Sequence, residues 1–113
     1  MMLKNKVAIV TGGTRGIGFA VVKKFIENGA AVSLWGSRQE TVDQALEQLK
    51  ELYPDAKISG KYPSLKDTAQ VTAMINQVKE EFGAVDILVN NAGISQSTSF
   101  IIISQKNSRK LWI

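Results

Sequence analysis

The chain has no cysteine and no histidine among its 113 residues. Without cysteine it can form no disulfide, no thiolate nucleophile and no cysteine-based zinc site. Without histidine it can build neither a Ser-His-Asp triad nor a histidine base, and most transition-metal sites are excluded. Any catalysis must therefore use carboxylates, lysine, tyrosine, serine or a bound cofactor, and no metal ligand is predicted.

Long apolar runs and clustered charge are absent as well. No segment approaches the roughly 18 apolar residues of a membrane-spanning helix, and the start of the chain lacks a signal-peptide core, so we predict a cytoplasmic protein with no membrane partner. The net charge is +4. Three of the basic residues lie in 100–113, and the remaining 11 basic residues face 10 acidic ones. Because nucleic acids bind clustered basic faces, we predict no nucleic-acid partner.

What the sequence does contain is an alternation of short apolar runs and amphipathic stretches. Residues 7–10 are wholly apolar, which is typical of a strand buried on both faces. A capping-box spacing from Ser37 to Glu40 marks the start of the second helix. The predicted strands are 7–10, 31–35, 57–62 and 86–89, with helices between them, the third at about 67–82. Such a βαβαβαβ unit has right-handed crossovers and a parallel sheet.

The first predicted strand leads into a glycine-rich turn that opens a helix. Gly12 permits the tight turn, Gly16 removes a side chain where the backbone must approach a pyrophosphate, and Gly18 lets the helix pack close to the strand. The helix start offers free N–H groups and the positive end of its dipole to phosphates. The alternative is a glycine-rich turn without a ligand. The strand–turn–helix context favours a dinucleotide site.

Two motifs together resemble the short-chain dehydrogenase/reductase family. Thr11-Gly12-x-x-x-Gly16-x-Gly18 is similar to its cofactor motif, and Asn90-Asn91-Ala92-Gly93 to its second signature. The resemblance covers residues 1–99 and implies an α/β fold, the first half of a Rossmann-type doubly wound parallel sheet with strand order 3-2-1-4 and its later strands absent. It also implies that Asn90 and its neighbours line the adenine–ribose side of the site and brace the sheet, and that Thr11 helps to hold that loop.

The resemblance implies an oxidoreductase that transfers hydride between a nicotinamide and a carbonyl or secondary alcohol. Segments such as 11–20 and 48–54 look like bacterial 3-oxoacyl-acyl-carrier-protein reductases and bile-acid 3α-hydroxysteroid dehydrogenases. The substrate would then be a 3-oxoacyl thioester or a hydroxysteroid. The expected partners are a nicotinamide dinucleotide and this small molecule, and the full-length parent is expected to be a homo-oligomer.

The end of the second strand bears on the choice of dinucleotide. A carboxylate about 20 residues beyond the glycine turn would bind the ribose 2′-hydroxyl and favour NAD, but residues 35–38 contain none. Arg15 and Arg38 suit a 2′-phosphate instead, so NADP is predicted as the cofactor, with NAD as second choice. The alternative is that both arginines are solvated surface charges without a ligand. Ser64 stands where the family often carries an aspartate that contacts adenine. The predicted cofactor-binding residues are Thr11, Gly12, Thr14, Arg15, Gly16, Ile17, Gly18, Ser37, Arg38, Ser64, Leu65, Asn90, Ala92 and Gly93.

The residues that the resemblance implies for hydride chemistry have no counterpart here. They are a serine, an asparagine and a Tyr-x-x-x-Lys pair, and they follow the second signature; only twenty residues follow Gly93, and none is tyrosine. Tyr53 and Tyr62 each begin a Tyr-x-x-x-Lys match, but a proline directly after each tyrosine excludes the helix that the pair needs. No catalytic residue is predicted, and the chain alone is expected to be inactive.

Residues 100–113 break the pattern and are predicted to be an irregular apolar and basic tail. Reading the back-translated tail from the third base of the Phe100 codon permits an amphipathic helix similar to the family's continuation. We therefore expect that a frameshift near Phe100 truncates a full-length reductase. The alternatives are a short non-catalytic module that binds a dinucleotide or a partner, and a tail that binds acidic surfaces. Without later strands the fourth strand would be an exposed edge, so self-association is expected.

Overall fold

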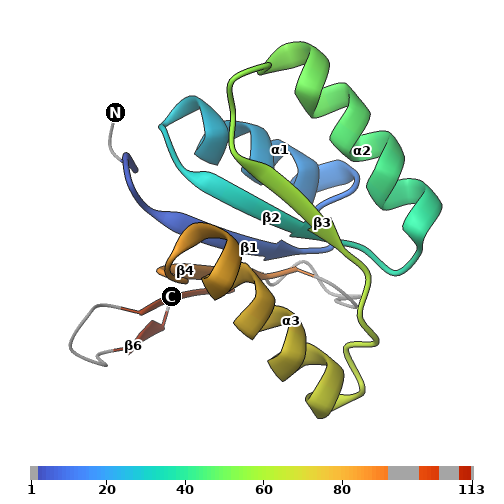
Figure 1. The fold of residues 1–113 in the computed structure, drawn as a ribbon, viewed down its shortest axis with the longest axis vertical. Coiled ribbons are helices and arrows are strands. Elements are labelled where there is room, and N and C mark those ends of the chain that lie inside the picture. Colours follow the sequence, from blue (N-terminus) through green and yellow to red (C-terminus); the bar gives the residue numbers. More distant parts are fainter. Residues whose placement is uncertain (1–2, 92–99, 105–109, 113) are drawn as a thin grey trace.

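The computed structural model describes residues 3–91, 100–104 and 110–112, and within 100–112 it describes the backbone alone. The described helices and strands form one sheet with helices on both of its faces (Figure 1). The elements are β1 (Val7–Thr11), α1 (Gly16–Glu27), β2 (Ala31–Trp35), α2 (Gln39–Leu52), β3 (Ile58–Lys61), α3 (Thr68–Phe82), β4 (Ile87–Asn90), β5 (Phe100–Ser104) and β6 (Lys110–Trp112). None of the described helices is long and apolar enough to cross a membrane.

The first four strands form the predicted parallel sheet. β1 pairs in parallel with β2 on one side and with β4 on the other, and β2 pairs in parallel with β3. The order β3-β2-β1-β4 confirms the α/β fold class and the predicted strand order. The carboxyl ends of these four strands therefore meet at one edge of the sheet, where the residues that follow each strand come together.

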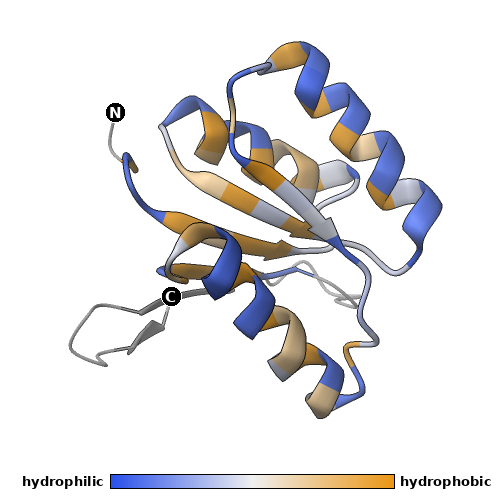
Figure 2. Ribbon diagram, in the orientation of Figure 1, coloured by the Kyte–Doolittle hydropathy of each residue, from blue (hydrophilic) through white to orange (hydrophobic). Residues whose placement is uncertain are grey.

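The two faces of the sheet are buried by different helices. Ala8 and Val10 of β1 belong to a core cluster that includes residues of α1 and α2, such as Val22 and Val42. Val7 and Ile9 alternate with them and pack in a second cluster with residues of α3. All five residues of β1 are buried, so its wholly apolar sequence reflects a strand covered on both sides. The apolar strands between more polar helices are visible in Figure 2.

The start of α2 differs from the prediction. The N-cap is Arg38, and no side chain caps the helix there, so the capping box expected from Ser37 to Glu40 does not form. Ser37 stands one residue before the observed cap, which puts the motif out of register. Thr41 instead donates its hydroxyl hydrogen to the Arg38 carbonyl over 3.0 Å. α3 begins with a side-chain cap, because the Asp67 carboxylate accepts from the N–H groups two and three residues further on.

The backbone after β4 also differs from the irregular tail that the sequence predicts. β5 pairs antiparallel with β4, from Ile87↔Ile103 to Asn90↔Phe100, and β6 pairs antiparallel with β5. β4 is therefore not an edge strand, and the argument for self-association through its exposed edge loses its basis. The physical reason is that an unpaired strand edge accepts any β-prone segment that can reach it. The family's later parallel strands are not among the elements described.

Candidate dinucleotide-binding site

The predicted cofactor residues gather at the carboxyl edge of the parallel strands. β1 ends at Thr11 and β4 at Asn90, and these two residues are register partners. The glycine-rich turn follows β1. Ser37 and Arg38 follow β2, and Ser64 with Leu65 follows β3. Ala92 and Gly93 lie outside the described residues. The structure thus brings the described members of the predicted set to one edge, although they come from four separate segments.

The Thr11 hydroxyl joins the two sequence motifs. Its oxygen accepts from the Asn91 backbone N–H over 2.9 Å. It lies 3.1 Å from the Asn90 side-chain oxygen and 3.3 Å from the Val89 carbonyl, and its single hydrogen can serve one of these two acceptors. The Asn91 side-chain amide donates to the Gly12 carbonyl over 3.4 Å. Segments about 80 residues apart in the chain are therefore hydrogen-bonded directly beside the glycine-rich turn.

Thr11→Val is expected to lower the free energy of unfolding by about 1–3 kcal/mol, because the isosteric side chain removes a buried hydroxyl and the Asn91 N–H loses this acceptor. Thr11→Ser keeps the hydroxyl and should lower the free energy of unfolding clearly less than Thr11→Val. Urea unfolding of the three chains measures the difference. Equal losses in the two variants would show that the hydroxyl contributes nothing to the junction.

The three glycines of the turn have distinct surroundings. Gly12 and Gly16 have φ of 64° and 61°, in the left-handed region that favours glycine. A Cβ on Gly18 would lie 2.0 Å from the Gly12 carbonyl oxygen, so α1 approaches the turn too closely for any side chain there. A Cβ on Gly16 would meet nothing within 4 Å. Gly18 therefore serves close packing, as expected, while Gly16 faces open space.

The start of α1 fits a bound phosphate. Its N-cap, Arg15, makes no side-chain cap hydrogen bond, and the first turn contains no acidic residue. The first N–H groups of the helix therefore have no side-chain acceptor at the cap, and the positive end of the helix dipole meets no carboxylate in that turn. Ile17, in the same turn, is 67% exposed. A pyrophosphate could be held here by backbone N–H groups, with an apolar side chain beside it.

The neighbouring helix start carries the second predicted arginine. Ser37 and Arg38 are both exposed, and Arg38 is the N-cap of α2. α1 and α2 cover the same face of the sheet (Figure 1), so Arg15 and Arg38 stand at the starts of two helices on one face. Leu65, which follows β3, is 44% exposed and adds a second exposed apolar side chain at this edge.

The structure also shows where the rejected tyrosine–lysine pairs lie. Tyr53 is the C-cap of α2 with φ −136°, outside helical geometry. Its hydroxyl donates to the Glu27 carboxylate, and this hydrogen bond raises the pKa of Tyr53. A catalytic tyrosine in this family would need a lowered pKa, so the environment of Tyr53 opposes such a role. Tyr62 is an exposed residue directly after β3.

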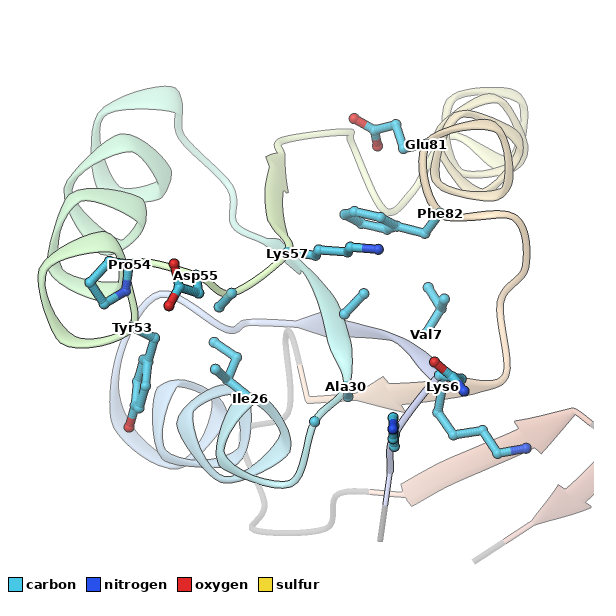
Figure 3. A pocket seen from close by; sticks show the side chains of 15 residues that line it. Lys6, Val7, Ile26, Ala30, Tyr53, Pro54, Asp55, Lys57, Glu81 and Phe82 are labelled. Atoms are coloured by element: carbon cyan, nitrogen blue, oxygen red, sulfur yellow. The ribbon is translucent and has the colours of Figure 1, made fainter. Parts of the chain in front are cut away.

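Tyr53 lines a hollow of about 780 Å³ at the opposite, amino edge of the sheet (Figure 3). Its walls come from the starts of β1 and β2, the segment after α2 and the end of α3, where Lys57 and Phe82 point toward one another. None of the predicted cofactor residues that the structure describes lines it. This hollow and the candidate site therefore lie at opposite ends of the strands.

Tyr53→Phe is expected to change the pH dependence of stability. Because the folded pKa of Tyr53 is raised, its hydrogen bond to Glu27 stabilises the fold fully below about pH 10 and is lost as the pH rises through the folded pKa. The stability difference between the wild type and the variant should thus be constant up to about pH 10 and then shrink. Urea midpoints from pH 7 to pH 11 measure it. A difference unchanged at pH 11 would contradict the assignment.

Comparison with known proteins identifies the class. The family model described as short chain dehydrogenase matches residues 6–112, and the chain belongs to this family. The chain is 91% identical over 111 residues to a 3alpha-hydroxysteroid dehydrogenase of Mediterraneibacter gnavus, covering 98% of this chain and 44% of that protein. It is 37% identical over 105 residues to a 3-oxoacyl-[acyl-carrier-protein] reductase of Chlamydia muridarum, covering 93% of this chain and 42% of that protein.

Two further similarities bear on the cofactor and the fold. An NADP-dependent (R)-specific alcohol dehydrogenase of Lentilactobacillus kefiri is 39% identical over 109 residues, covering 96% of this chain and 42% of that protein. The crystal structure of a short chain dehydrogenase from Mycobacterium smegmatis superposes with a TM-score of 0.77 at 31% identity, covering 86% of this chain and 40% of the other. The chain thus spans less than half the length of the relatives that it matches.

Proposed function

We propose that the chain is the dinucleotide-binding portion of a short-chain oxidoreductase and that it binds the adenosine half of NADP at the carboxyl edge of its sheet. The observation that carries this proposal is the hydrogen-bonded junction of Thr11 with Asn90 and Asn91, directly beside a glycine turn whose Gly16 faces open space. The N–H groups that open α1 would hold the pyrophosphate. The bound dinucleotide would supply the hydride chemistry.

The preference for NADP over NAD rests on the residues after β2. Residues 36–38 offer no carboxylate to a ribose 2′-hydroxyl, whereas Arg15 and Arg38 offer guanidinium groups to a 2′-phosphate. The relative from Lentilactobacillus kefiri is named as NADP-dependent, which supports the same preference. Ser37, Ser64 and Leu65 would line the adenosine side, and Ala92 and Gly93 would complete it.

Titration of the chain with NADPH and NADH tests the proposal. Charge-assisted hydrogen bonds to a 2′-phosphate are worth about 1.5–3 kcal/mol, so NADPH should bind at least about tenfold more tightly. Isothermal titration calorimetry measures both affinities. Equal affinities would refute the NADP preference alone, and binding of neither dinucleotide would refute the proposed site.

The reaction of the whole protein would be hydride transfer between the nicotinamide and a carbonyl or secondary alcohol. The 91% identity to a 3alpha-hydroxysteroid dehydrogenase favours a hydroxysteroid, and a 3-oxoacyl thioester is the second candidate. The chain alone would not catalyse this, because no Ser, Tyr and Lys set of the kind that the family uses follows residue 93. We expect the purified chain neither to oxidise NADPH with a 3-oxoacyl thioester nor to reduce NADP with a hydroxysteroid. Turnover that disappears in Gly16→Ala would contradict this expectation.

The origin of the short chain is a separate part of the proposal. We propose a frameshift near Phe100 in the gene of a cytoplasmic, homo-oligomeric reductase. Resequencing through that codon and the following several hundred bases tests it. A serine and a Tyr-x-x-x-Lys pair in the shifted frame would support truncation. No such frame would favour the alternative, a short non-catalytic module that binds a dinucleotide or a protein partner.

A further inference from the structure

The position that follows β2 has no room for a side chain. An ideal Cβ on Gly36 would lie 2.7 Å from the Thr14 methyl carbon and 2.8 Å from one methyl carbon of Val42. The backbone of Gly36 itself is ordinary: its φ lies outside the left-handed region, and its N–H donates to the Lys61 carbonyl over 3.0 Å. Crowding by two methyl groups, and not backbone conformation, therefore opposes a side chain at this position unless Thr14 or Val42 shifts.

Thr14 is held against Gly36 by the turn that contains it. The N–H of Gly13 donates to the Trp35 carbonyl over 3.1 Å, which fixes the turn to the end of β2. Gly13 is itself crowded, since a Cβ there would lie 3.0 Å from the Val10 carbonyl oxygen and 3.1 Å from the Leu34 Cβ. The turn cannot move away from Gly36 without breaking this hydrogen bond or disturbing the core beneath it.

Val42 is equally constrained from the other side. It is 1% exposed and packs between α2 and the sheet. A Cβ on Gly60 of β3 would lie 2.4 Å from its second methyl carbon, so Val42 fills the space above both glycines. α2 covers the same face of the sheet as α1 (Figure 1), and Val42 is one of the α2 residues in the core cluster on that face.

This crowding matters because of where position 36 stands. It is the first residue after β2 and lies 20 residues beyond Gly16, where a carboxylate would accept a hydrogen bond from a ribose 2′-hydroxyl. We infer that Thr14 and Val42 are specificity-determining residues, because their methyl groups keep a carboxylate out of position 36 and leave the ribose to the side chains of Ser37 and Arg38. This inference rests on the proposed function, in which the adenosine ribose lies here.

The steric part of the inference is tested by the thermal stability of the full 113-residue chain. Gly36→Ala should lower the melting temperature by about 5–10 °C in the wild-type background. In the Thr14→Ser/Val42→Ala background, which lacks both crowding methyl groups, the same substitution should lower it by less than half as much. Ser37→Ala, at the exposed neighbouring position, is the matched control and should leave the melting temperature unchanged. Equal losses in the two backgrounds would overturn the inference.

The selectivity part is tested with 2′,5′-ADP and 5′-AMP, which differ in the 2′-phosphate. By calorimetric titration the wild type should favour 2′,5′-ADP. Gly36→Asp alone should weaken both ligands without favouring 5′-AMP, since the new side chain displaces the turn. In the Thr14→Ser/Val42→Ala background, Gly36→Asp should move the affinity ratio toward 5′-AMP by at least about tenfold. The reason is that a carboxylate accepts a hydrogen bond from the ribose 2′-hydroxyl and repels a 2′-phosphate.

Two results would overturn the inference in distinguishable ways. If Gly36→Asp alone shifts the ratio as far as it does in the Thr14→Ser/Val42→Ala background, Thr14 and Val42 do not determine specificity, and the proposed function stands. If the wild type binds neither ligand while both backgrounds remain folded, the proposed function fails and the inference fails with it.

Discussion

Gly18→Ala is expected to lower the free energy of unfolding by at least about 3 kcal/mol or to prevent folding. A Cβ at this position would lie 2.0 Å from the Gly12 carbonyl oxygen and 2.9 Å from the Asn91 side-chain nitrogen. The first of these is a backbone atom of a turn that continues from β1, so the strain can be relieved only by moving α1 or the turn, at the upper end of overpacking costs or above. Urea unfolding followed by circular dichroism measures the loss.

Gly16→Ala is the matched control, since it adds the same methyl group two residues earlier. Nothing lies within 4 Å of that Cβ, and the only structural cost is the left-handed backbone at φ 61°, about 1–2 kcal/mol. This variant should fold and should lose dinucleotide binding, because its methyl group projects into the space where a pyrophosphate would approach. If Gly16→Ala were the more destabilising of the two, the assignment of packing to Gly18 and of ligand access to Gly16 would be wrong.

Removing residues 100–113 is expected to destabilise the chain and to cause self-association. β5 pairs with β4 at four positions, and hydrogen bonds of this kind contribute about 1 kcal/mol each, so a loss of about 2–4 kcal/mol is expected. The removal also exposes the backbone of β4 as an apolar edge, which favours pairing between copies. Urea unfolding and sedimentation velocity measure the two effects.

Ile102→Pro separates the loss of pairing from the shortening of the chain. β5 pairs on both sides, with β4 and with β6, so a proline at its centre removes a backbone donor that the sheet uses. This full-length variant should lose stability and associate as the truncated chain does. A truncated chain that stays monomeric and as stable as the wild type would contradict the role of β5 as the cover of β4.

The sequence predicts the parallel half of the fold because local patterns there agree with the tertiary structure. The apolar run in β1 and the helical spacing of Val42 and Leu49 each match the burial observed. The start of α2 was predicted one residue early because Ser37 is itself a suitable cap, and the choice between neighbouring caps depends on the path of the chain. The pairing of β5 was not predicted, because it depends on the unpaired edge of β4, and the apolar run 100–103 alone does not show which strand it joins.

Within the site, the sequence identifies the motifs but not how they meet. The contact of the Asn91 side chain with Gly12 was not predicted, although Asn91 stands inside the second motif. The crowding of Gly36 joins residues 14, 36 and 42 from three elements, and no pattern along the chain brings them together. The one sequence signal for this crowding was Gly36 itself, a glycine directly after a strand at a position where neither a turn nor a positive φ requires glycine.

The most direct test of the account is protection of the chain from urea unfolding by NADPH. At 100 times its dissociation constant the ligand should raise the free energy of unfolding by about 2.7 kcal/mol in the wild type. The folded Gly16→Ala variant should gain nothing at the same concentration. Protection that is equal in both chains, or absent from the wild type at millimolar NADPH, would contradict a dinucleotide site at the glycine-rich turn.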